Sequence, residues 1–273
     1  MQRRGWIKNT TNTDEIASEI KRFFRIPDLD SVPEFPVSAR KADRLEQLSG
    51  PQRAWCFRAR ELASSLVVNG FSKVLLPQVK AKLRECAAYA REARHLPKVL
   101  SEAGIRFVVV EPLPGAKIDG AAFWLEERSP VIAVSIRFDR IDAFWFTVMH
   151  ELAHVESEDA LSVDSDLAGE DTVPAALKLS QERSADAKAA AMLVPPDELN
   201  SFIRRVGPLY SKERITQFAY RIKMHPGIIV GQLQHLGEIG YSANREMLVK
   251  MRDVVTNVSL TDGWGRTVAL GDN

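Results

Sequence analysis

The sequence contains His150-Glu151-Leu152-Ala153-His154, in which two histidines are four residues apart. On a helix, side chains with this spacing project from one face, so both imidazoles can reach one Zn2+ at roughly 2.0–2.1 Å. Glu151 falls to the side of this pair, where it can accept a proton from metal-activated water instead of binding the metal. The pattern predicts a hydrolytic zinc centre with His150 and His154 as ligands and Glu151 as general base. A pair of structural histidines is the alternative.

A second helix, predicted from Ser180 to Val194, offers a third ligand. A catalytic zinc site needs three protein ligands and an open position for water. Glu182 and Asp186 lie on one stripe of this helix, and the alanines around them permit a close approach to another helix. We expect Glu182 to bind the metal and Asp186 to orient a histidine ring. Alternatively, Glu182 only interacts with the dipole at the start of its helix.

The helix that carries the two histidines is expected to lie between two layers. Its large apolar side chains form one broad stripe, and the histidines lie on the opposite side among small and apolar residues. The stripe consists of Ile141, Phe144, Trp145, Val148, Leu152 and Val155. One face should therefore pack on a sheet while the other lines a cleft. Asp139 is predicted to cap this helix, which runs to about Glu156.

Short β-branched and aromatic runs before this helix predict a small sheet. The runs are Ile105–Glu111, Gly120–Glu126 and Pro130–Ile136. Further helices are predicted at 13–24, 53–68, 77–93 and 97–103, with a linker at 28–36 and three shorter helical stretches after Pro196. Residues 157–179 are predicted to be irregular, and the tail from Tyr241 has only a weak pattern. The fold class predicted is α+β.

The composition is that of an ordinary soluble globular protein, with 45% hydrophobic and 27% charged residues among 273. No apolar run reaches the length of a membrane span, and no apolar segment follows the basic start, so neither a transmembrane helix nor a secretory signal is expected. The two cysteines, Cys56 and Cys86, are expected to be reduced thiols, which suggests the cytoplasm. With 37 basic and 36 acidic residues, the chain has no overall field that would hold a nucleic acid.

HELAH after FWFTVM, together with ERSADAKAAAMLVP, resembles the ImmA/IrrE family of zinc metallopeptidases. The resemblance implies a zincin-like minimal metallopeptidase core and a Zn2+ cofactor. In that family the first motif supplies two histidine ligands and the general base, which correspond to His150, His154 and Glu151. The glutamate that opens the second motif supplies the third ligand, which corresponds to Glu182.

The resemblance spans about residues 100–240, and the segment before it resembles the helical region of one branch of the family. We therefore divide the chain into a helical N-terminal region, the peptidase core, a helical subdomain and a C-terminal tail. These parts are residues 1–98, 99–196, 197–240 and 241–273. That branch usually begins with a Cro/cI-type helix-turn-helix domain, which we expect to be absent here. Some of its members lie beside toxin genes as antitoxin-like regulators.

Three further features give weaker indications of function. The acidic side chains between Val155 and Asp171 are expected to be solvated, although they could deepen the negative potential near a cation. His225 is expected either to stabilise an oxyanion near the cleft or to begin a helix before Pro226. The segment 213–237 predicts two short helices, either a packed hairpin or a helix-turn-helix that reads DNA.

The function predicted is that of a zinc metalloendopeptidase that cuts a partner regulatory protein, by analogy a repressor or an antitoxin. An extended substrate would pair with a free edge of the sheet. The alternative is a non-proteolytic, antitoxin-like scaffold that binds a toxin or a DNA-binding partner. Direct binding to nucleic acid by this chain and binding to a membrane are not expected.

Overall fold

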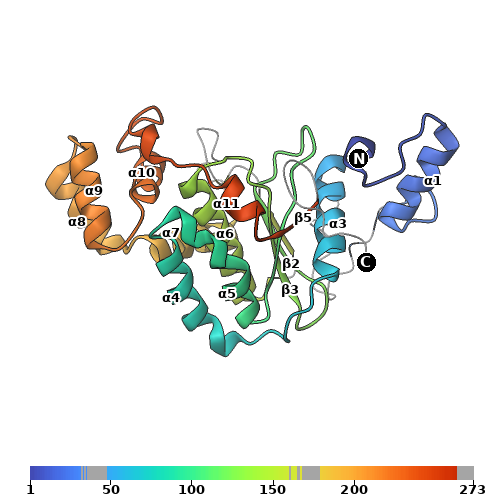
Figure 1. Cartoon of the computed structure of the whole chain (residues 1–273), viewed down its shortest axis with the longest axis horizontal. Coiled ribbons are helices and arrows are strands. Elements are labelled where there is room, and N and C mark those ends of the chain that lie inside the picture. Colours follow the sequence, from blue (N-terminus) through green and yellow to red (C-terminus); the bar gives the residue numbers. More distant parts are fainter. Residues whose placement is uncertain are drawn as a thin grey trace.

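One sheet with helices on both faces forms the centre of the protein (Figure 1). The computed structural model describes residues 1–31, 33, 35, 48–159, 161–164, 167 and 179–262, and five strands pair within these ranges. The strands are β1 Arg106–Val109, β2 Gly120–Trp124, β3 Pro130–Val134, β4 Leu161–Asp164 and β5 Leu260–Thr261. Their order is β4-β2-β3-β1-β5, with β1 parallel to β3 and β5, and β2 antiparallel to β3 and β4. The α+β fold class is confirmed.

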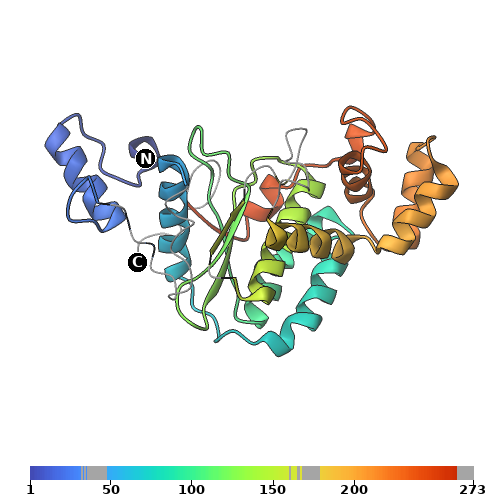
Figure 2. The ribbon, with the colours of Figure 1, turned by 180° about the vertical axis from the view of Figure 1, so that it is seen from behind.

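Helices cover the two faces of this sheet unequally (Figure 2). Short 3-10 turns join several of them. The α-helices are α1 Thr13–Phe24, α3 Gly50–Ser64, α4 Leu76–Cys86, α5 Leu96–Glu102, α6 Ile141–Ser157, α7 Ser180–Leu193, α8 Pro196–Val206, α9 Lys212–Arg221, α10 Pro226–His235 and α11 Arg252–Thr256. α3 lies against one face, whereas α4, α5, α6 and α7 lie on the other (Figures 1 and 2). α1 and the pair α8–α9 lie at opposite ends of the long axis.

The strands are buried on both faces because their alternate side chains enter two different hydrophobic clusters. On β1, Phe107 and Val109 join the cluster of α4–α6, while Val108 joins the cluster beneath α3. β2 and β3 follow the same alternation, with Ala122 and Ile132 in the first cluster. This period of two explains why the runs are continuously apolar, since neither face is exposed to water.

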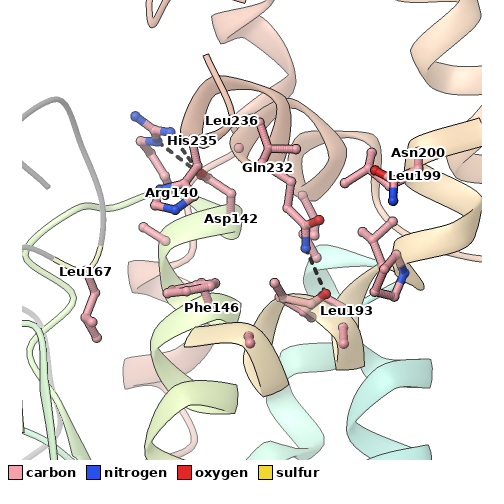
Figure 3. Close-up of a pocket in the computed structure, with 18 of the residues that line it drawn as sticks. Arg140, Asp142, Phe146, Leu167, Leu193, Leu199, Asn200, Gln232, His235 and Leu236 are labelled. Atoms are coloured by element: carbon pink, nitrogen blue, oxygen red, sulfur yellow. Dashed lines mark hydrogen bonds and ion pairs between the residues drawn. The ribbon is translucent and has the colours of Figure 1, made fainter. Parts of the chain in front are cut away.

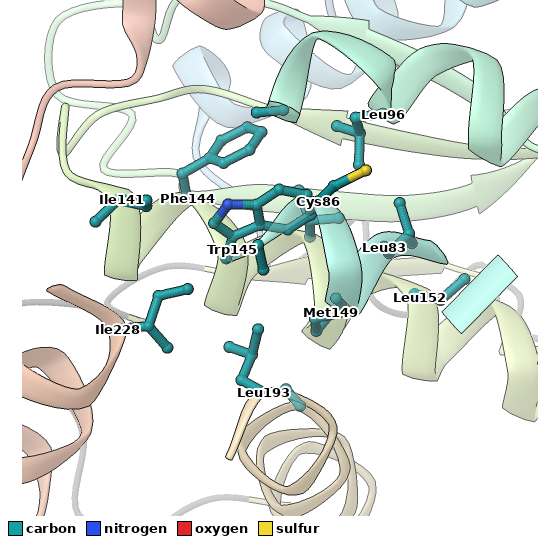
Figure 4. Close-up of a cluster of buried hydrophobic side chains, with 14 of the residues drawn as sticks. Leu83, Cys86, Leu96, Ile141, Phe144, Trp145, Met149, Leu152, Leu193 and Ile228 are labelled. Atoms are coloured by element: carbon teal, nitrogen blue, oxygen red, sulfur yellow. The ribbon is translucent and has the colours of Figure 1, made fainter. Parts of the chain in front are cut away.

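α6 is the central helix of the larger cluster, as its apolar pattern predicted. Trp145 and Met149 are completely buried among side chains of α4, α5 and α7 (Figure 4). Both hydrophobic clusters combine residues from the N-terminal helical region with residues from the strands. The division of the chain into four parts stays a prediction.

The structure corrects the predicted start of α6. Its N-cap is Arg140, which makes no capping hydrogen bond with its side chain, and not Asp139. Asp139 Oδ1 instead accepts hydrogen bonds from the backbone N–H groups of Met251 and Arg252, each at 2.7 Å. Asp139 therefore ties the tail to the start of α6, and the sequence around it could not reveal this distant partner.

Two strands occur where the sequence predicted none. β4 lies inside the stretch predicted to be irregular, and β5 lies in the weakly patterned tail, where it extends the sheet beside β1. Both are short, and only pairing with β2 or β1 makes them strands. Residues 160, 165, 166 and 168–178 of the predicted excursion, and residues 32, 34 and 36 of the predicted linker, lie outside the described residues.

α9 and α10 form the predicted pair of short helices, and α10 packs on α6 instead of presenting a free face. Ile228, Ile229, Val230 and Leu233 of α10 are all buried. None of the described helices combines the length and the apolar character that crossing a membrane requires.

Candidate metal centre

The imidazoles of His150 and His154 and the carboxylate of Glu182 converge between α6 and α7. The two Nε2 atoms are 3.0 Å apart, and Glu182 Oε2 lies 3.3 Å from each of them. α6 places the histidines one turn apart on the same face. α7 can approach closely because Ala185 and Ala189, which are buried beside α6, have small side chains. The structure thus brings together the three residues predicted as ligands.

A carboxylate lies at the outer nitrogen of each imidazole. Asp186 Oδ1 is 3.0 Å from His150 Nδ1, and Asp159 Oδ2 is 2.8 Å from His154 Nδ1. Such partners hold the proton on Nδ1 and leave the lone pair of Nε2 for a metal. Asp186 has the place that the sequence predicted for it. Asp159 was grouped with the solvated acidic loop, and no periodic pattern could have singled it out because it follows the end of α6.

Glu151 lies completely buried between α6 and strand β2. A Cβ atom at Gly120 of β2 would come within 2.5 Å of Glu151 Oε1 and 2.7 Å of Thr147 Cγ2. A glycine is therefore needed at this position for the strand to approach α6. The close approach leaves Glu151 little freedom to move.

Asp164, the last residue of β4, adds a fourth potential metal ligand at the same point. Its Oδ2 atom lies 3.4 Å from His150 Nε2 and 3.9 Å from His154 Nε2. Ser162, on the same face of the strand, donates a hydrogen bond to this oxygen at 2.7 Å. The motifs predict an open position for water at the metal, whereas the structure places the carboxylate of Asp164 next to the two Nε2 atoms.

The pKa values around this point follow from burial and from the crowding of carboxylates. Burial raises the pKa of Glu151 well above its usual range, and the charge of Asp164 raises it further. Burial lowers the pKa of His150, but Asp164 and the neighbouring carboxylates outweigh it and leave the pKa well above its usual value. Burial also raises the pKa of Glu182, but hydrogen bonds with His150 and His154 outweigh it and hold the pKa far below its usual range. The site therefore favours positive charge at its centre.

These donors fit a divalent transition metal ion. Two imidazole nitrogens and carboxylate oxygens are the ligands that zinc takes at roughly 2.0–2.2 Å. The potential ligand atoms of His150, His154, Asp164 and Glu182 all lie within 4.8 Å of one another. Manganese and iron accept the same donor types, so the donor set alone does not select zinc.

The structure does not place His225 among these residues. It is the N-cap of α10, where its Nδ1 atom accepts a hydrogen bond from the backbone N–H of Gly227 at 3.1 Å. Burial lowers the pKa of His225. Of its two predicted roles, the position of His225 fits the start of a helix.

A cavity of about 300 Å3 lies beside the metal centre, between α6, α7, α8 and α10 (Figure 3). Its lining is mainly apolar and includes Leu193, Leu199 and Leu236. Phe146 lies on its wall, and the ring of this residue is 6.2 Å from the ring of His150. The ion pair between Arg140 and Asp142 also borders the cavity, about one turn of α6 before Phe146 (Figure 3).

Residues 101–223 match the model of the Peptidase M78 family, described as an IrrE N-terminal-like domain. This segment contains all the residues of the metal centre. No curated protein matches the chain.

Proposed function

Because residues 101–223 belong to the Peptidase M78 family as an IrrE N-terminal-like domain, we propose that the chain is a zinc-dependent endopeptidase whose centre lies between α6 and α7. The observation that carries this proposal is the convergence of His150, His154 and Glu182, with Glu151 buried beside them. A bound divalent ion would supply Lewis acidity towards a scissile carbonyl and towards water.

The chain's own residues would hold the ion, orient its ligands and transfer the proton. His150, His154 and Glu182 would hold the ion, while Asp159 and Asp186 keep the two imidazoles in the binding tautomer. Glu151 would take the proton of the attacking water and return it to the leaving amine. Its raised pKa suits this role, because a carboxylate with a high pKa is a strong base once it is ionised.

The cavity beside Phe146 supports an apolar preference for one residue of the substrate. It is large enough for a bulky side chain, and its wall is continuous with the helix that carries His150. We propose that an apolar side chain next to the cleaved bond enters this cavity. The substrate itself would be a partner regulatory protein, by analogy with the family a repressor or an antitoxin-like regulator, in a cytoplasmic setting.

Two substitutions test the proposal together. Glu151→Gln should keep the metal and lose hydrolysis of fluorescein-labelled casein, since only the proton acceptor changes. Glu182→Ala should lose most of the bound metal, measured by elemental analysis after gel filtration. Glu158→Gln, on the exposed end of α6, is the matched control and should retain both. Hydrolysis that survives Glu151→Gln, or equal metal content in Glu182→Ala and wild type, would refute the assigned roles.

A second candidate function is favoured by Asp164. A site with four protein ligands is typical of structural zinc, and such a site would serve an antitoxin-like scaffold that binds a toxin or a regulator without cutting it. Co-purification of a stable complex with an uncleaved partner, combined with no casein hydrolysis by any variant, would favour the scaffold over the peptidase.

A further inference from the structure

Five distances among the four donor atoms of the metal centre are compatible with the corners of a tetrahedron. A tetrahedral zinc ion with bonds of roughly 2.0–2.1 Å separates its ligand atoms by about 3.3 Å. The distances among the atoms of His150, His154 and Glu182 are 3.0, 3.3 and 3.3 Å. Asp164 Oδ2 adds distances of 3.4 and 3.9 Å to the two imidazole nitrogens. These five distances suit a zinc-sized tetrahedron in which Asp164 Oδ2 takes the fourth corner.

We propose that Asp164 is a fourth protein ligand of the metal and that strand β4 holds the peptidase in a closed state. This inference rests on the proposed function, because it assumes a hydrolytic centre that needs an open position. Catalytic zinc sites keep one position for water or substrate, and structural sites do not. With the Asp164 carboxylate bound, the centre has the ligand count of a structural site.

The surroundings of Asp164 support its assignment as a ligand. The Asp164 side chain is buried, and Ser162 Oγ donates a hydrogen bond to Oδ2, the oxygen that faces the imidazoles. Gly120, opposite Asp164 in the β-ladder, has no side chain to come between this carboxylate and Glu151. The backbone is fixed as well, because Asp119 N donates to Asp164 O at 2.8 Å.

β4 also occupies the place that an extended substrate would need. It pairs antiparallel with β2 over four residues, from Leu161 opposite Phe123 to Asp164 opposite Gly120. An extended peptide could bind the sheet next to α6 by pairing with β2, but only where that edge is free. Leu161 and Val163 anchor the strand from the other face, within or against the cluster beneath α3. The residues of β4 thus occupy both the fourth ligand position and the edge of β2.

Opening of the site then requires one movement. If β4 separated from β2, Asp164 would move away from the metal position, and an extended peptide could pair with the exposed edge of β2 and place its carbonyl there. The substrate class that follows is a protein segment able to form a β-strand. A small molecule could reach the metal without occupying that edge.

Cobalt substitution tests the ligand assignment without any measurement of activity. The wild-type protein, Asp164→Ala, Asp164→Asn and the control Glu158→Gln are loaded with Co2+, and their visible spectra are recorded during titration with azide. Wild type and Glu158→Gln should not respond to azide, because no position is open to it. Asp164→Ala should have a changed spectrum that responds to azide, and its metal should be lost to a chelator about tenfold faster or more. Asp164→Asn, which preserves the size of the side chain, gives the same comparison if the alanine variant does not fold.

The outcomes separate the two proposals. A wild-type spectrum that responds to azide as the Asp164→Ala spectrum does would overturn the closed state while leaving the metal centre intact. Failure of wild type to take up Co2+ or Zn2+ would overturn the metal centre and this inference with it. If Asp164→Ala opens to azide, fluorescein-labelled casein should be cut about tenfold faster by its zinc form than by wild type. If the Asp164→Ala site responds to azide but its zinc form does not cut casein, Asp164 is still a ligand, but the proposal that β4 holds a peptidase in a closed state is wrong.

Discussion

The substitution Gly120→Ala tests how closely β2 must approach α6 for the site to form. The added Cβ would lie 2.5 Å from Glu151 Oε1 and 2.7 Å from Thr147 Cγ2, whereas ordinary contacts begin at 3.4 Å. The strand or the helix must therefore retreat by about 0.7–0.9 Å. Overpacking of this kind costs about 1–3 kcal/mol. For a chain of this size, each kcal/mol lowers the melting temperature by about 2–4 °C.

The same retreat should affect activity more than stability. A misplacement of about 1 Å of a catalytic group can lower the rate by about 100-fold. Gly120→Ala should therefore melt several degrees below wild type and hydrolyse casein about 100-fold more slowly, with metal content preserved. Thermal unfolding followed by circular dichroism and the casein assay measure both effects. Gly50→Ala, where an added Cβ meets no atom within 4 Å, is the matched control and should change neither.

A second substitution tests whether Thr147 Cγ2 contributes to the clash with the Cβ atom added at position 120. Thr147→Ser removes the Cγ2 atom, so Gly120→Ala should cost less stability in that background than in wild type, with a coupling of about 0.5–3 kcal/mol. Activity should not recover, because Glu151 stays displaced. A Gly120→Ala protein that melts at the wild-type temperature and cuts casein at the wild-type rate would show that β2 does not constrain Glu151.

Three further outcomes are expected. Asp159→Asn and Asp186→Asn should each weaken metal binding by about 10–100-fold in chelator competition, because they orient the imidazoles; unchanged affinity would contradict that role. Since burial lowers the pKa of His225, the unfolded chain binds its proton more readily, so stability should fall as the pH drops below about 6.5. His225→Asn keeps a capping side chain and should lose less stability than wild type between pH 7.5 and 5.5 in urea titrations; equal losses would argue against this titration. Trp55→Phe should destabilise the fold by about 1–3 kcal/mol in urea, because the indole N–H donates to the buried carbonyl of Val110; a neutral effect would show that this bond contributes little.

The central helices could be predicted from the sequence because their signals are local. The apolar stripe of α6 and the stripe of small residues on α7 each repeat with helical periodicity, and both helices lie close to their predicted bounds. Two histidines and a glutamate within one motif could be placed relative to one another for the same reason. Glu182 needed the family resemblance, because a carboxylate in the first turn of a helix has other uses.

The remaining parts of the site depend on tertiary contacts that no local pattern contains. β4 has only four residues, and Ser162 and Asp164 face the metal centre instead of a hydrophobic core. Their alternation with Leu161 and Val163 is too brief to distinguish a strand from a loop. Asp159 likewise acquires its role only because α6 ends just before it and the chain returns to His154.

The burial of this centre also explains why metal binding and folding should be coupled. Glu182 and Asp164 are carboxylates held against two imidazoles in a part of the protein from which water is largely excluded, and Glu151 is fully buried beside them. Unpaired charges in such surroundings are costly, and protonation of His150 and His154 relieves the cost only in part, because each added proton repels the other. A divalent ion bound by all four residues would neutralise two carboxylates at once and would use the lone pairs of both imidazoles. We therefore expect a bound divalent cation to stabilise the folded state, because it would relieve the same crowding of charge.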